Sequence, residues 1–219
     1  MFSYENLKKD SEIISYINAA NNVLGEIGYT EHGLAHVVKT GEDASRILAS
    51  LGYDERECEL AKIAGLLHDT GNMINRWDHA QSGAFIAFEL LRARNFPVDE
   101  IIKVTTAIGH HDEKTAAPVT PIAAALILAD KSDVRTSRVR NKNTVSVDIH
   151  DRVNYAVFSS KLDIDGESKK IFLTLKIDTL ICPVMEYFEI FLERMVLCKK
   201  SAAYLGCEFE LIINDTRLL

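Results

Sequence analysis

The stretch AKIAGLLHDTGN, residues 61–72, combines an apolar helical segment with a histidine–aspartate pair at its end. Apolar side chains occupy nearly every face of this helix, which is typical of a helix at the centre of a core. Asp54 begins this helix, and Gly71 follows its end, where a glycine can break the regular backbone. His68 and Asp69 would diverge by about 100° on a regular helix, so both can point into one site only near such an end.

The segments on both sides show the same helical pattern, joined by short connections. Apolar residues recur at helical spacing from about Asp10 to Ile27 and from Thr30, a plausible N-cap, to Leu51. Further helices are predicted from Asp78, as the N-cap, to about Arg94, from Pro97 to about His110, and over the apolar run at 121–130. No strand pattern precedes residue 140, so the chain is predicted to be mainly α, with residues 1–140 forming a helical bundle.

The pattern changes near Asn141, and residues 141–219 are predicted to form a small α+β module with the order ββαβ. Two alternating segments, 152–164 and 169–178, are joined through Asp165-Gly166 and predict a β-hairpin. A helix from Pro183 to about Leu205 and a final strand at 207–213 complete the module. It contains no catalytic motif. It could pair two subunits as a homodimer, cover a cleft of the helical domain, or bind an effector.

Composition excludes several classes of protein. The 219 residues are 47% hydrophobic and 26% charged, which is ordinary for a globular chain. The net charge of −7 argues against unspecific nucleic-acid binding. No apolar run is long enough to span a membrane, and the N-terminus lacks the apolar core of a signal peptide. Four cysteines without a CxxC pair predict reduced, mostly buried thiols in a cytoplasmic protein.

Histidines are concentrated in the helical part, where six of the seven lie between His32 and His111. Taken singly, each is typical of an ordinary surface or core residue. Together with the two aspartates that end apolar helices, Asp69 and Asp130, they form a set of ligand types that first-row divalent metals prefer. A metal would offset the cost of burying several imidazoles and carboxylates in one pocket.

The order His36, His68-Asp69 and Asp130 resembles the HD superfamily of metal-dependent phosphohydrolases. The supporting stretches are EHGLAHVV around His36, AKIAGLLHDTGN around the pair, and IAAALILADKSD around Asp130. The resemblance covers about residues 11–140. It implies an HD-domain helical bundle in which these four residues are the ligands of a first metal ion.

The resemblance extends to the subset of that family that binds two ions. His79, in WDHAQSGAFIAFELL, is similar to the histidine that follows the pair in this subset, and His110 and His111 resemble its His-His pair. Asp69 would then bridge two divalent ions, for which manganese, iron, nickel, zinc and magnesium are all candidates. Alternatively, His79 caps a helix or lies on the surface.

The sequence departs from the motifs of two HD subfamilies, and each departure argues against the substrate of that subfamily. The pair is followed by Thr70-Gly71-Asn72 instead of the Glu-Asp signature of the hydrolases of hyperphosphorylated guanosine nucleotides. His111 is followed by DEKTAAPVTP, without the Gly-Tyr-Pro motif of the cyclic-di-GMP phosphodiesterases. Neither substrate is therefore expected.

A basic cluster follows Asp130 directly. It contains Lys131, Arg135, Arg138, Arg140 and Lys142. Guanidinium and ammonium groups suit phosphate oxygens, so Lys131 and Arg135 are candidates for substrate binding, although a solvated helix end would show the same pattern. His32 lies four residues before His36 and could approach the metal or the substrate, or be a surface histidine.

These observations predict a cytoplasmic phosphohydrolase, either a phosphomonoesterase or a phosphodiesterase, that acts on a nucleotide or related small phosphoester. The catalytic candidates are Asp69 and Lys131, and a metal-activated water is the nucleophile. Two alternatives stay open. One is a di-iron oxygenase of the HD type, and the other is a non-catalytic protein that binds a metal or nucleotide for regulation.

Overall fold

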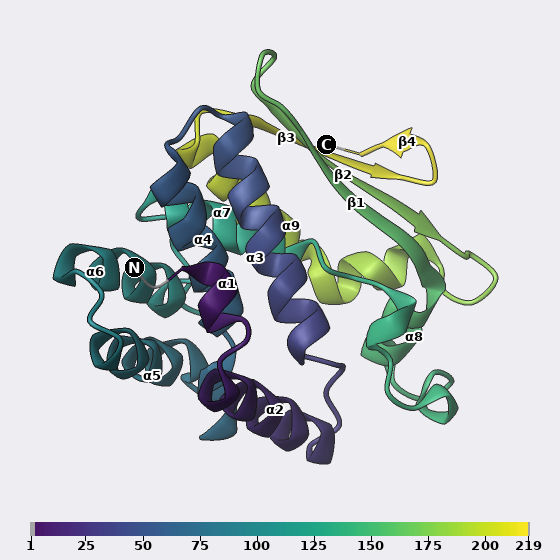
Figure 1. Cartoon of the computed structure of the whole chain (residues 1–219). Helices are drawn as coiled ribbons and strands as arrows, with labels where there is room; N and C mark the ends of the chain where they lie inside the picture. The colour runs from purple at the N-terminus through teal and green to yellow at the C-terminus, as the bar shows by residue number, and fades with distance from the viewer. Residues whose placement is uncertain (1–2, 219) are drawn as a thin grey trace.

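The computed structural model describes residues 3–218 as a helical bundle with a small sheet packed beside it (Figure 1). The helical part contains α1 Tyr4–Leu7, α2 Ser11–Glu26, α3 Leu34–Ser50, α4 Glu55–Leu67, the 3₁₀ turn η1 Thr70–Met73, α5 His79–Ala93, α6 Val98–Gly109 and α7 Pro121–Lys131. The remainder contains η2 Thr136–Arg138, η3 Lys142–Thr144, α8 Ile149–Ala156, β1 Val157–Asp165, β2 Lys170–Ile177, α9 Val184–Tyr204, β3 Glu208–Ile213 and β4 Thr216–Arg217. The predicted mainly α class with a C-terminal α+β part is confirmed.

Local chemistry explains where the helices begin. The Asp10 carboxylate accepts hydrogen bonds from the backbone N–H groups of Glu12 and Ile13 at the start of α2. Asp54 accepts from Glu57 N–H at the start of α4. Thr120 caps α7 in the same way, directly before a proline at the first helical position. These caps fix the first turns of α2, α4 and α7, of which α4 and α7 lead to the site.

The two most apolar helices lie at the centre of the bundle, as their sequences predict. In α7 every residue from Ile122 to Ala129 is buried, and in α4 every residue from Ile63 to Leu67 is buried. Helix α3 packs along both of them. Because a fully buried helix end has no access to bulk water, the polar residues at the ends of α4 and α7 must find partners inside the protein.

Two glycines let α3 and α4 approach at the level of their main chains. A Cβ placed on Gly65 of α4 would lie 2.4 Å from the Cα of Gly41 on α3, closer than any side chain permits. Gly41 follows His36 by about one and a half helical turns, and Gly65 precedes His68 by about one turn. The contact therefore sets the separation of the helix segments that carry these two histidines.

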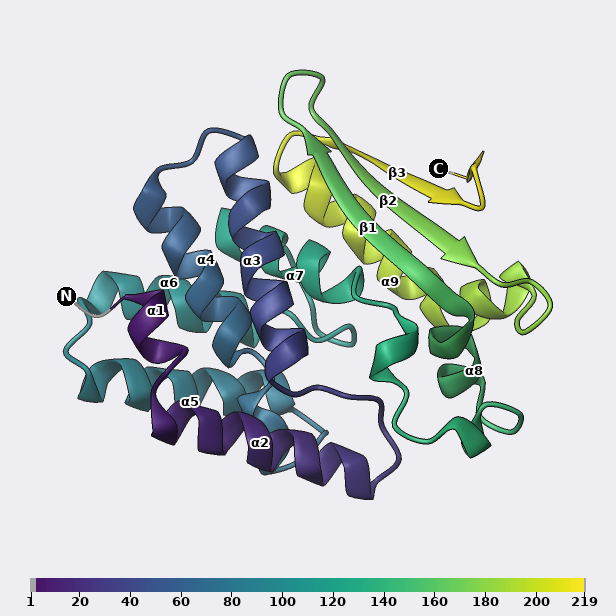
Figure 2. The ribbon, with the colours of Figure 1, turned by 45° about the vertical axis from the view of Figure 1, so that its right-hand side comes forward.

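The sheet has the strand order β1-β2-β3-β4, and α9 lies between it and the bundle (Figure 2). Strands β1 and β2 form the predicted antiparallel hairpin, whereas β3 pairs parallel to β2. A parallel pair requires a crossover connection, and α9 supplies it. Since α9 also packs on α7, it is the element that joins the sheet to the helical part.

Several elements differ from the sequence prediction. The segment 152–156, predicted as the beginning of a strand, completes α8, because the Asp148 carboxylate caps that helix by accepting from Asp151 N–H. Strand β4 and helix α1 are too short to give a periodic signal. Helix α3 begins at Leu34 and not near Thr30, because the Glu31 carboxylate binds Gly33 N–H and holds the preceding turn out of the helix. Asp78 stands at the N-cap of α5 in a left-handed conformation, with φ of 56°, and its side chain makes no cap hydrogen bond.

Candidate metal centre

His36 lies at the centre of the site, fully buried on the first turn of α3. Its Nε2 is 3.3 Å from Asp130 Oδ1 and 3.6 Å from Asp69 Oδ2. Its other ring nitrogen, Nδ1, lies 2.7 Å from Oδ2 of Asp133, which is also fully buried. With Nδ1 donating to that carboxylate, Nε2 carries the lone pair and faces the other two carboxylates.

His68 and Asp69 enter the same site from the end of α4. Helix α4 ends at Leu67, His68 is its C-cap, and Asp69 precedes η1, so both side chains point inward as predicted from Gly71. His68 Nδ1 donates to the carbonyl of Gly65 at 2.8 Å, and its Nε2 lies 3.3 Å from Asp69 Oδ2. The Asn72 side-chain amide donates to Asp69 Oδ1 and fixes the carboxylate.

His79 and His111 form a second pair of imidazoles on the other side of Asp69. Their Nε2 atoms are 3.2 Å apart, and His79 Nε2 is 3.8 Å from Asp69 Oδ1. Both Nδ1 atoms donate to backbone carbonyls, those of Arg76 and Ile108. Two lone pairs would therefore face each other at short range, and the Arg76 guanidinium lies 3.4 Å from His79 Nε2. Imidazole nitrogens oriented in this way, with Nδ1 bound to a carbonyl, are typical of metal ligands.

Three atoms of the cluster are buried without a hydrogen-bond partner in the part of the chain that the structure describes. They are His36 Nε2, His68 Nε2 and Asp69 Oδ2. Two overlapping groups place one ligand atom per residue within 4.8 Å of one another, namely His36, His68 and Asp130, and His68, Asp69 and His111. Since buried polar atoms are rarely left unpaired, and since nitrogen and oxygen ligands bind first-row divalent ions, this set of donors fits a metal ion.

His110 is the one predicted ligand that the structure does not bring into this cluster. It is half-buried at the C-cap of α6, and no contact within the cluster among residues 3–218 involves its side chain. Its neighbour His111 points inward instead. A role for His110 as a ligand stays a prediction.

Burial and neighbouring charges shift the pKa values of the residues in this cluster in opposite directions. Burial alone would lower the pKa of His68, but the Asp69 and Asp130 carboxylates raise it to about 10. Burial would raise the pKa of both carboxyl groups, yet His68 holds that of Asp69, and Lys131 that of Asp130, well below the ordinary value. The pKa of His111 lies well below its ordinary value because of burial and of nearby positive charge, so its imidazole is neutral and able to bind a cation.

A cavity of about 20 Å³ opens beside the cluster, and cationic side chains surround it. Besides the ligand candidates, it is lined by His32, Arg76, Glu113, Lys131, Arg138 and Arg194. Lys131 is buried, and its ammonium lies 2.6 Å from Asp130 Oδ2, as its place in the sequence predicts. The ring of His32 is 5.4 Å from that of His36, although His32 precedes α3 and does not share a helical face with it.

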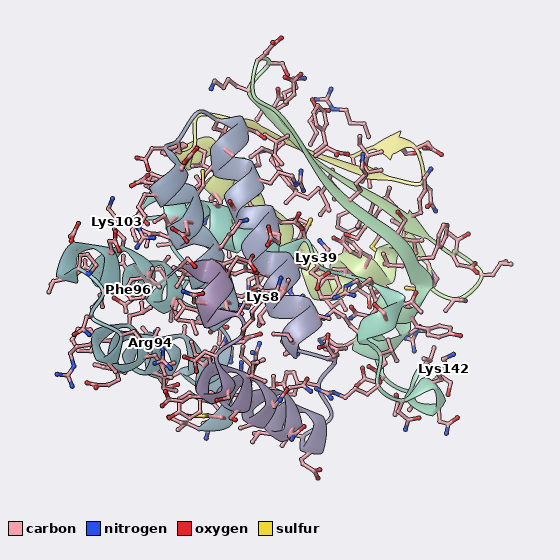
Figure 3. All side chains as sticks on the ribbon, in the orientation of Figure 1. Lys8, Lys39, Arg94, Phe96, Lys103 and Lys142 are labelled. Atoms are coloured by element: carbon pink, nitrogen blue, oxygen red, sulfur yellow. The ribbon has the colours of Figure 1, made fainter. Side chains whose placement is uncertain are left out.

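The predicted basic cluster does not gather in one place. Arg135 does not line the cavity, and its guanidinium binds the Asp133 carboxylate at 2.8 Å. Arg140 binds backbone carbonyls of Tyr29 and Asn21. Lys142 begins the 3₁₀ turn η3 before α8, at the periphery of the molecule (Figure 3). Lys131 and Arg138 therefore are the members of the cluster that reach the cavity.

Four residues of the site were not identified from sequence. Asp133 lies three residues after Asp130, just beyond the end of α7 and among the residues of the basic cluster, where no pattern marks it as a partner of His36. Arg76 lies in the turn between η1 and α5, and Glu113 in the loop between α6 and α7. Arg194 lies on α9, far away in the sequence. Since none lies in a motif, only the folded chain shows that they converge.

Comparison with known protein families gives one match, and it lies in the helical part of the chain. Residues 33–135, which contain α3 to α7, match the HD domain. The matched segment contains His36, His68, Asp69 and Asp130 and ends just after Asp133. It does not include α8, α9 or the sheet.

Several known proteins are similar to part of this chain. Ribonuclease Y of Opitutus terrae is 37% identical over 102 residues, which are 47% of this chain and 18% of that protein. An uncharacterized protein of Methanocaldococcus jannaschii is 23% identical over 159 residues, 63% of this chain and 61% of that protein. A crystal structure of a predicted HD superfamily hydrolase from an uncultured Thermotogales bacterium covers 57% of this chain and 67% of that chain, with 28% identity and a TM-score of 0.45. The chain thus spans less than a fifth of the length of the ribonuclease Y relative that it matches.

Two further predictions can be compared with the structure. All four cysteines are buried and unpaired, as expected. Among residues 3–218, no helix combines the length and apolar character that crossing a bilayer would require.

Proposed function

We propose that this protein is a metal-dependent phosphohydrolase that acts on a small phosphorylated substrate, a nucleotide or related phosphoester. The observation that carries the proposal is the buried His/Asp cluster, whose unpaired nitrogen and oxygen atoms face one another beside a cavity lined by cations. The family supports it, and so do relatives named ribonucleases, because a ribonuclease breaks a phosphodiester bond.

Two divalent ions fit the set of donors. His36, His68, Asp69 and Asp130 would bind the first, and His79 and His111 would bind the second together with Asp69, whose two oxygens face the two groups of histidines. Ions bound there lower the pKa of a bound water, so that hydroxide is available near neutral pH.

The protein's own residues then have distinct roles. Asp133 fixes the ring of His36, and the carbonyls of Gly65 and Ile108 fix those of His68 and His111. Lys131 places a buried positive charge next to Asp130, where it can offset negative charge on phosphoryl oxygens. Arg76 and Arg138 line the same cavity and add positive charge at its wall.

Hydrolysis assays test the proposal directly. Phosphomonoesters, cyclic nucleotides and dinucleotides would be incubated with the purified protein and Mn²⁺, Fe²⁺ or Zn²⁺. At least one class should release product, a chelator should abolish the reaction, and His36→Ala should reduce it to background. His150→Ala is the matched control, because the side chain of His150 is 60% exposed on α8. Absence of turnover with every substrate, or oxygen consumption with Fe²⁺ in place of hydrolysis, would contradict the proposal.

A further inference from the structure

Helix α9, which lies outside the matched HD segment, reaches the candidate site with one side chain. Arg194 lines the cavity beside the histidine cluster, and its guanidinium lies over the ring of Phe191, 4.2 Å from the ring centroid. Its Nε is 2.6 Å from Glu113 Oε1. Glu113 comes from the irregular segment between α6 and α7, so three parts of the chain meet here.

Glu113 lies between two cations of the cavity wall. The same Oε1 atom that contacts Arg194 lies 3.4 Å from the ammonium of Lys131. Lys131 is already paired with Asp130 at 2.6 Å, and Arg194 has no other ion pair among the described residues. A single carboxylate therefore contacts two positive groups of the cavity wall at once.

The cavity is narrow in this arrangement. A volume of about 20 Å³ accommodates little more than one water molecule. A phosphoryl group carries several oxygens, each of about that size, so part of the lining must move before it can enter. Arg194 and Lys131 stand on regular helices, whereas Glu113 stands on a loop and is 24% exposed, so it can turn towards solvent.

We propose that Arg194 is an anion-binding residue of this site and that the Glu113 carboxylate occupies, in the ligand-free protein, the position between Arg194 and Lys131 that a substrate phosphoryl group takes. A carboxylate and a phosphate present similar charged oxygens to a guanidinium fork. The α+β part of the chain thereby supplies one side of the substrate site. This inference rests on the proposed phosphoester substrate.

The test measures anion binding separately from catalysis. Inorganic phosphate and adenosine 5′-monophosphate are titrated calorimetrically into the full-length protein with its metal content determined beforehand. Arg194→Gln should weaken binding about tenfold, the scale of one lost hydrogen bond to a charged group. Glu113→Gln should strengthen it about threefold or more, because a competing internal anion is removed. Arg194→Lys, which keeps the charge but loses the fork, should give an intermediate affinity.

A matched pair of controls is available on α5. Arg92 and Glu89 form an ion pair whose two side chains are each 64% exposed, so Arg92→Gln and Glu89→Gln should leave phosphate affinity unchanged. Far-ultraviolet circular dichroism and the metal content establish that each variant is folded. Opposite effects at Arg194 and Glu113 distinguish an anion site from a structural ion pair, in which both substitutions would only destabilise the fold.

The outcomes separate the inference from the proposed function. Unchanged or weaker phosphate binding in Glu113→Gln, or unchanged binding in Arg194→Gln, overturns the inference even when the wild-type protein hydrolyses phosphoesters. The expected changes in affinity, without hydrolysis of any substrate, support the anion site and overturn the proposed reaction. A wild-type protein that binds neither anion overturns the inference.

Discussion

Asp133 and His36 are both fully buried, and the Asp133 carboxylate accepts a hydrogen bond of 2.7 Å from His36 Nδ1. The two residues are 97 positions apart in sequence. Burial raises the pKa of Asp133, but His36, and after it Arg138 and Arg135, hold that pKa far below the ordinary value. Arg135 binds the carboxylate and Arg138 donates to the backbone carbonyl of Asp133. The partner of the central histidine is therefore a permanently charged acceptor that fixes the ring and its tautomer.

Replacement of this acceptor should loosen metal binding. Asp133→Asn preserves the shape but removes the charge that orients His36, so we expect metal affinity to fall by about 10–100-fold. Competition titration with a chromogenic chelator measures the effect. Asp163→Asn on β1 is the control, because that carboxylate is 43% exposed and pairs only with Lys161 among the contacts described here. Equal affinities of the two variants would show that Asp133 does not position His36.

His79 tests whether a second ion binds. Its Nε2 faces His111 and Asp69 Oδ1, away from the first group of ligands. In His79→Ala, metal content should fall from about two ions per chain to about one, because the second site loses a ligand while the first keeps its four. Elemental analysis after gel filtration gives the number. If the stoichiometry of the variant equals that of the wild type, His79 is not a ligand.

Metal binding should depend on pH through His68. In the ion-free protein the adjacent carboxylates raise its pKa to about 10, so His68 is protonated at pH 7, and an ion must displace that proton. The sign follows: apparent affinity should rise by about tenfold per pH unit from pH 6.5 to 9 for one proton released. Calorimetry in buffers of different ionisation enthalpy counts the protons. A pH-independent affinity, or proton uptake on binding, would contradict the raised pKa.

The contact between α3 and α4 should be sensitive to a single methyl group. In Gly65→Ala, the new Cβ would meet the Gly41 backbone at 2.4 Å, so we expect a loss of about 3 kcal/mol in the free energy of unfolding. Gly109→Ala on α6 is the control, because its Cβ would lie 3.8 Å from the nearest atom and should stabilise by about 0.5–1 kcal/mol. Urea unfolding of the ion-free proteins compares the two. A Gly65→Ala variant as stable as the wild type would show that the helices can separate without cost.

Much of this structure follows from local sequence. The helices from α2 to α7 are predicted to within a few residues, because capping residues and apolar periodicity act over short distances. The His/Asp order identified six candidate ligands whose side chains do converge in the structure. Helix α8 was misinterpreted because its sequence, RVNYA, also alternates, and the decisive signal was the cap at Asp148.

The rest of the site depends on distant contacts that no local pattern records. The parallel pairing of β3 with β2 places α9 against α7, and only this packing brings Arg194 to the cavity. Glu113 and Arg76 likewise have no motif around them. Conversely, the basic residues around Arg135 in the sequence indicate a role in substrate binding. In the structure Arg135 pairs with the buried Asp133 and does not line the cavity.

The paired glycines of α3 and α4 have a consequence for how this scaffold can change. Where two helices meet through their main chains, their spacing does not depend on the volumes of the surrounding aliphatic side chains. Drift or redesign among those aliphatic residues should therefore leave the distance between the two central imidazoles unaltered. Residues of the apolar interior and residues of the candidate ion site can then be substituted independently of each other, in evolution or by design.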